Sequence, residues 1–73
     1  MLNERKTTLV LEEAMRGSRK FWERQGYDER EAFIKALEEV EGMTTDPFSP
    51  CGAKLDVATK KKFIEYRKMD LGL

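Results

Sequence analysis

WERQGYDERE, residues 22–31, carries the signals that end one helix and begin another. Gly26 suits the left-handed C′ position that follows many helices, because glycine has no Cβ to clash there. With Gly26 at C′, Tyr27 falls at C″ and Trp22 at C3, which is the spacing of the hydrophobic contact in a Schellman ending. The stretch therefore predicts that a helix ends at this glycine.

The same stretch predicts where the second helix begins. Asp28 suits the N-cap position, and Glu31 follows it at the spacing that completes a capping box. The turn between the two helices is then very short, as in antiparallel helical hairpins. We therefore expect a hairpin of two helices at about 3–25 and 29–41, with Asn3 as the first N-cap.

Apolar residues recur along both expected helices at the three- and four-residue steps of a core-facing stripe. The stripe of the first helix consists of Val10, Leu11, Ala14, Met15, Ser18, Phe21 and Trp22, and that of the second of Ala32, Phe33, Ala36, Leu37 and Val40. Gly17 interrupts the first helix at a cost of about 1 kcal/mol relative to alanine. Since the stripe keeps its phase across Gly17, we expect one continuous helix, although residues 7–11 are rich enough in β-branched side chains to suit an extended segment.

A loop with two prolines follows the hairpin. Pro47 and Pro50 cannot lie inside a helix, so residues 43–55 are expected to form this loop. Phe48 lies between the prolines, and we expect its ring to cover the core.

A third helix is expected at about 57–70, with Asp56 as its N-cap. Gly42 is expected to end the second helix in the left-handed conformation, as Gly26 ends the first. The predicted fold class is therefore all-α, a small three-helix domain in which residues 1–73 form a single unit.

The residue inventory argues against an enzyme. The chain has no histidine, which is the usual general base and the commonest metal ligand, so serine–histidine and cysteine–histidine nucleophile pairs are absent. One cysteine cannot build a zinc site alone, and the five glycines are scattered singly rather than gathered in a phosphate-binding loop. We therefore expect a non-enzymatic protein with no cofactor and no metal site.

Cysteine usage and hydropathy bear on the compartment. The single cysteine excludes an intramolecular disulfide and fits a reducing compartment, no signal peptide is visible, and the longest purely apolar run is Leu9-Val10-Leu11. We therefore expect a cytoplasmic protein without a membrane partner. Cys51 is either an exposed, modifiable thiol or a partly buried, inert loop residue, and the tendency of cysteine to be buried favours the second interpretation.

Charge is balanced overall, at 14 basic and 14 acidic residues, but it is divided along the chain. Residues 23–46 carry three basic and eight acidic residues, whereas residues 47–73 carry six basic and three acidic ones. The five candidate phosphate contacts of the third helix are Lys60, Lys61, Lys62, Arg67 and Lys68. Consecutive lysines do not share one helix face, however, and charge runs on helices are more often simply solvated.

The adjacent aromatic residues of the first helix form the other candidate site. Phe21 and Trp22 cannot both point into the core, so one of them should lie at its edge, where an exposed aromatic ring can anchor a partner. In the favoured alternative, Tyr27 covers Trp22 through the Schellman contact. These three residues form the candidate protein-interaction edge.

Two classes of function remain. The favoured one is a small non-enzymatic protein-interaction or regulatory accessory module of bacterial or phage type, whose partner is another protein or a second copy of the chain. The alternative is a nucleic-acid-associated accessory protein that uses the basic face of the third helix. In that case the basic residues of the first helix would assist it, namely Arg5, Lys6, Arg16, Arg19 and Lys20.

Overall fold

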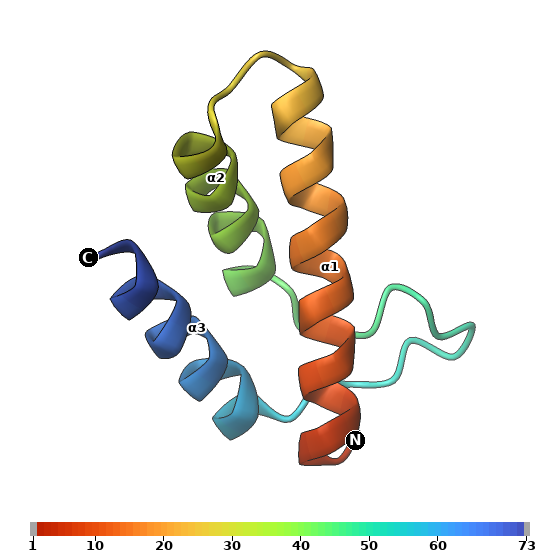
Figure 1. The fold of residues 1–73 in the computed structure, drawn as a ribbon. Helices are drawn as coiled ribbons and strands as arrows, with labels where there is room; N and C mark the ends of the chain where they lie inside the picture. Colours follow the sequence, from red (N-terminus) through yellow and green to blue (C-terminus); the bar gives the residue numbers. More distant parts are fainter. Residues whose placement is uncertain (1, 73) are drawn as a thin grey trace.

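The computed structural model describes residues 2–72, which form three α-helices. These are α1 (Glu4–Arg24), α2 (Glu29–Glu41) and α3 (Val57–Leu71). Figure 1 shows α1 and α2 as the arms of an antiparallel hairpin, with α3 leaning against them and the loop on the other side of α1. No strand occurs within the described residues. Thr45 and Lys54 form an isolated antiparallel β-bridge that does not extend into a sheet. The predicted all-α, three-helix fold is confirmed.

The turn between α1 and α2 has the predicted Schellman geometry. Gly26 has a φ of 100°, and its N–H donates to the Glu23 carbonyl at 3.1 Å. The Tyr27 N–H donates to the Trp22 carbonyl at 3.3 Å, and the two rings meet edge to face with centroids 5.5 Å apart. The backbone groups freed at the end of α1 are thus satisfied locally, and the chain reverses within a few residues.

Two of the three predicted N-caps bind the backbone of their helices. The Asn3 Oδ1 accepts from the Lys6 N–H, and the Asp28 Oδ1 accepts from the Glu31 N–H, both at 2.8 Å. The return bond from the Asp28 N–H to the Glu31 carboxylate does not form within residues 2–72, so only half of the predicted capping box is present.

Gly42 and Asp56 differ from expectation. Gly42 has φ −82° and ψ −8°, so the predicted left-handed ending is wrong, because the backbone stays right-handed and the Met43 N–H bonds back to the Val40 carbonyl at 3.0 Å. Asp56 is the N-cap of α3, but its carboxylate accepts from the Thr59 hydroxyl rather than from a backbone amide.

The core lies where the hairpin meets α3. It consists of Val10, Leu11, Met15, Ala36, Leu37, Val40, Leu55, Phe63 and Ile64. Most of the predicted stripes of α1 and α2 contribute, and Ala14 and Phe33 pack against the core from its edge. Ser18, Phe21 and Trp22 lie outside the core, and Phe21 is the exposed one of the three, at 51%.

Thr7 ties the start of α1 to the start of α3. Its side chain is fully buried, and its hydroxyl accepts from the Asp56 N–H at 3.1 Å. The Leu2 N–H donates to the Lys54 carbonyl at 2.8 Å beside it. Residues 7–11 are helical, which excludes the extended alternative for this segment.

The proline-containing loop is anchored by an acidic residue and not by its aromatic one. Phe48 is 64% exposed, so the expectation that it covers the core is wrong. Asp46 is buried instead, and its Oδ1 accepts from the Phe48 N–H at 2.8 Å. This local hydrogen bond compensates the burial of a polar side chain and turns the aromatic ring outward.

Replacing Gly17 with alanine should stabilise the protein. The helix is continuous through Gly17, and beyond its own backbone no atom lies within 4 Å of a Cβ built there. Because alanine loses less backbone entropy in a helix, we expect Gly17→Ala to raise the free energy of unfolding by about 0.5–1 kcal/mol. Urea denaturation followed by circular dichroism measures the change. A loss of stability would mean that another element crosses α1 closely at this point.

Candidate functional site

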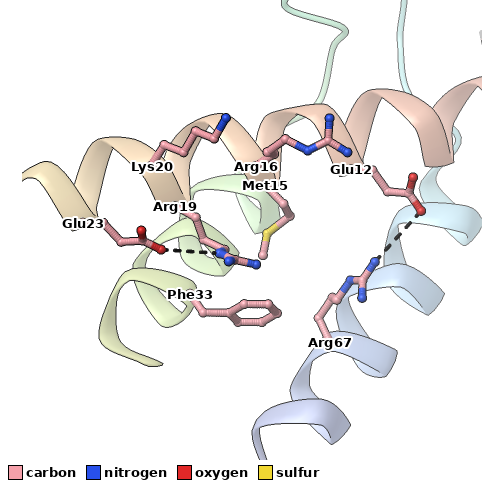
Figure 2. Close-up of a pocket in the computed structure, with 8 residues that line it drawn as sticks. All are labelled: Glu12, Met15, Arg16, Arg19, Lys20, Glu23, Phe33 and Arg67. Atoms are coloured by element: carbon pink, nitrogen blue, oxygen red, sulfur yellow. Dashed lines mark ion pairs between the residues drawn. The ribbon is translucent and has the colours of Figure 1, made fainter. Parts of the chain in front are cut away.

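A cleft of ≈ 380 Å³ lies between the three helices. We call it the arginine cleft, and it is lined by Glu12, Met15, Arg16, Arg19, Lys20 and Glu23 of α1, Phe33 of α2 and Arg67 of α3 (Figure 2). The α1 members recur at three- and four-residue steps, which places them on one side of the helix. The hairpin brings Phe33 beneath that side, and α3 brings Arg67 to the opposite wall.

Arg19 lies over the ring of Phe33, and its Nε donates no hydrogen bond to the described residues. Its guanidinium carbon lies 5.8 Å from the centroid of the Phe33 ring, within the range of a cation–π contact. Its Nε is buried and donates no hydrogen bond within residues 2–72. Glu23 Oε1 lies 3.9 Å from this Nε, beyond hydrogen-bond distance. A buried donor without an acceptor is uncommon in folded proteins.

Arg67 is positioned in a similar way on the opposite wall. Its guanidinium carbon lies 4.9 Å from the centroid of the Phe63 ring. Its two ion pairs are long, at 4.0 Å to Glu12 and 3.5 Å to Asp70. Charge-assisted hydrogen bonds between nitrogen and oxygen are typically about 2.7–2.9 Å. The N–H groups of Arg67 are therefore only loosely engaged and remain available to another acceptor.

The arginine cleft combines a cationic wall with an apolar floor. Figure 2 shows Met15 and Phe33 together below α1, whereas Arg16 and Lys20 extend along its outer side. A guanidinium stacked on an aromatic ring has fewer orientations to lose when it binds, and its planar edge matches a carboxylate. This arrangement suits a ligand that presents an oxyanion next to an apolar group.

The three residues of the candidate interaction edge lie together, with Trp22 between the other two. The Phe21 and Trp22 rings lie 5.0 Å apart, and Tyr27 covers Trp22 from the other side, as the favoured interpretation predicts. The Trp22 Nε1 and the Ser18 hydroxyl both donate to the Glu39 carboxylate, at 3.0 and 2.6 Å. Trp22 therefore joins α1 to α2, and Phe21 is the exposed member.

The basic residues of α3 are divided among three surroundings. Lys60 donates to the carbonyls of Glu41 and Met43 at 3.1 and 2.8 Å. Lys68 lies 3.5 Å from the Glu41 carboxylate, and Arg67 faces the arginine cleft. The remaining two, Lys61 and Lys62, are exposed and form no ion pair among the described residues. These five side chains do not form one continuous phosphate-binding patch.

Cys51 is exposed, so the expectation that it is partly buried is wrong. It lies in a turn closed by the Gly52 N–H, which donates to the Ser49 carbonyl at 3.2 Å.

Sequence reasoning did not find the arginine cleft as a site. It placed Arg16, Arg19 and Lys20 in one basic cluster and Arg67 in another, and it assigned Phe33 to the core. The spacing of the α1 residues was a usable signal, because three- and four-residue steps put them on one side. That these residues share a cleft with Arg67 depends on how α3 packs against the hairpin, which their spacing does not reveal.

Comparisons with known proteins add no relative: no protein-family model, curated protein or solved structure matches the chain. Within residues 2–72 no helix is long and apolar enough to cross a membrane. In the same part of the chain, no three acidic or cysteine side chains gather as potential metal ligands.

Proposed function

We propose that the protein is a small non-enzymatic interaction module that binds an acidic segment of a partner protein in the arginine cleft. One observation carries the proposal: Arg19 and Arg67 line the same cleft, each within cation–π distance of an aromatic ring and each 3.5 Å or more from its carboxylate partners. Protein segments offer carboxylates and apolar side chains together, which is the combination that this cleft suits.

A protein partner fits the arginine cleft better than a nucleic acid does. Glu12 and Glu23 line the cleft and would repel the closely spaced phosphates of a duplex. The residue that α2 contributes to the cleft is the uncharged Phe33, and the lysines of α3 lie in separate surroundings. A second copy of the chain belongs to the same class of partner, because residues 23–46 carry eight acidic residues. The exposed single thiol, Cys51, fits a reducing compartment, and on that ground we place the module in the cytoplasm.

Binding to defined probes tests the proposal. The probes are a peptide of glutamate and leucine residues and a short random DNA duplex, each titrated into the isotopically labelled protein and followed by NMR. We expect the peptide to shift the amide signals of residues that line the arginine cleft. We expect Arg19→Ala/Arg67→Ala to weaken peptide binding by at least about tenfold, because each arginine can contribute about 1.5–3 kcal/mol through charged hydrogen bonds.

The matched control is Lys61→Ala/Lys62→Ala, which removes the same charge from an exposed part of α3. It should change peptide affinity by less than about twofold, since exposed charges contribute little to a distant site. Equal losses in both variants, or no peptide binding at all, would contradict the proposal. Duplex binding that depends on Lys61 and Lys62 would favour the nucleic-acid alternative instead.

A further inference from the structure

We infer that Arg19 and Phe33 form the recognition pair of the arginine cleft, and that the partner presents a carboxylate side chain to Arg19 beside a large apolar side chain on Phe33. The inference rests on the proposed function and specifies the chemistry of the bound segment. It follows from the cation–π contact between the two side chains and from the parts of each that a ligand in the cleft can reach.

Arg19 offers its terminal N–H groups to a ligand in the cleft. Its Nε is buried without a hydrogen bond, and Glu23 Oε1 stays 3.9 Å away. The side chain as a whole is 39% exposed, so the terminal nitrogens are the groups that a ligand can reach. A carboxylate can accept two N–H groups from one guanidinium, and such a bidentate pair is strong and specific in its geometry.

Phe33 supplies the apolar half of the pair. Its ring supports one face of the Arg19 guanidinium and lines the arginine cleft beside Met15 (Figure 2). The same ring also borders a neighbouring hollow of ≈ 370 Å³ that Leu71 lines from the end of α3. An apolar side chain of the partner can therefore reach the ring without displacing Arg19, and burying that side chain adds the hydrophobic contribution to binding.

Glu23 favours a carboxylate over a phosphate at Arg19. The lining of the arginine cleft as a whole has four basic and two acidic residues, so it attracts anions. At Arg19 itself, however, Glu23 Oε1 lies 3.9 Å from Nε. A carboxylate brings a single negative charge beside that glutamate, whereas a phosphorylated side chain brings about −1.5 to −2 at neutral pH and is repelled by it more strongly.

Three peptides separate the contributions of charge and apolar contact. The first contains glutamate and leucine, the second has every leucine replaced by alanine, and the third has every glutamate replaced by phosphoserine. We expect the first peptide to bind at least about tenfold more tightly than the second, because a large buried apolar side chain contributes more than about 1.4 kcal/mol. It should also bind more tightly than the third, because phosphoserine brings more negative charge beside Glu23. Calorimetry or NMR titration gives the dissociation constants.

Variants of this chain then test the residues. Arg19→Lys keeps the charge but removes the planar edge, so we expect about tenfold weaker binding of the first peptide. The control, Arg24→Lys, makes the same change at an exposed residue of α1 that does not line the arginine cleft, and it should alter affinity by less than about twofold. Phe33→Leu, checked for folding by its melting curve, should reduce the preference for leucine over alanine.

The outcomes distinguish this inference from the function on which it rests. If the leucine and alanine peptides bind equally and Arg19→Lys changes nothing, the recognition pair is wrong while binding of acidic segments stands. Tighter binding of the phosphoserine peptide would overturn the assignment of a carboxylate. If none of the peptides binds, both the inference and the proposed function fail.

Discussion

Leu11→Ala is expected to remove most of the free energy that holds the protein folded at 25 °C. Leu11 is 0% exposed and is among the largest fully buried side chains of the core. Truncating a buried leucine to alanine costs about 2–5 kcal/mol, because apolar contact is lost and a cavity remains. A domain of this size is expected to have only about 3–5 kcal/mol of total stability. Urea denaturation of the variant, followed by far-ultraviolet circular dichroism, should therefore show a midpoint shifted to a much lower urea concentration than that of the wild type.

Leu9→Ala provides the matched control on the same helix. Leu9 is 52% exposed, so its truncation opens no cavity, and we expect the free energy of unfolding to change by no more than about 0.5 kcal/mol. Both substitutions replace leucine with alanine in α1, so they differ chiefly in burial. Similar losses in the two variants would show that α1 does not pack with the side chains that the structure buries.

The helical hairpin could be predicted from sequence because its signals are local. The hydrogen-bonding side chains of Asn3 and Asp28 and the backbone freedom of Gly26 each act within a few residues. Gly42 shows the limit of the same reasoning. It also follows a helix directly, but its backbone stays right-handed, and the N–H groups of Gly42 and Met43 bond back to carbonyls of α2. Glycine permits the left-handed conformation and does not require it.

The loop and the start of α3 depend on contacts between distant residues, which no local pattern contains. The Thr7 hydroxyl accepts from the Asp56 N–H across most of the chain. Sequence reasoning expected the apolar Phe48 to be covered, whereas the buried residue is Asp46. A short polar side chain can be buried where a nearby N–H compensates it, and hydropathy alone does not reveal such a compensation.

The two candidate sites also differ in how far the sequence alone could predict them. The aromatic edge could be predicted because Phe21, Trp22 and Tyr27 are near neighbours in the chain and the Schellman turn brings two of them together. The arginine cleft combines Arg19 of α1, Phe33 of α2 and Arg67 of α3. Its existence depends on where α3 packs, so periodicity could place the α1 residues on one side but could not supply the opposite wall.

Gly26→Val should destabilise the protein by at least about 1–2 kcal/mol, the cost of left-handed geometry in a residue with a Cβ. Gly26 has a φ of 100°, where a β-branched side chain is especially strained. Apart from its chain neighbours, no atom lies within 4 Å of a Cβ built at Gly26, so the expected loss is conformational and not a clash with another element. Urea denaturation of the variant and the wild type measures it.

Gly17→Val makes the same substitution where the backbone is helical and the surrounding space is equally open. Valine is a better helix former than glycine, so this control should leave stability unchanged or slightly higher. A clear loss at Gly26 with none at Gly17 would assign the effect to the left-handed turn. Equal stability of the two variants would show that the turn tolerates another geometry. In that case the angle between α1 and α2, which places Phe33 beneath Arg19, would not depend on Gly26.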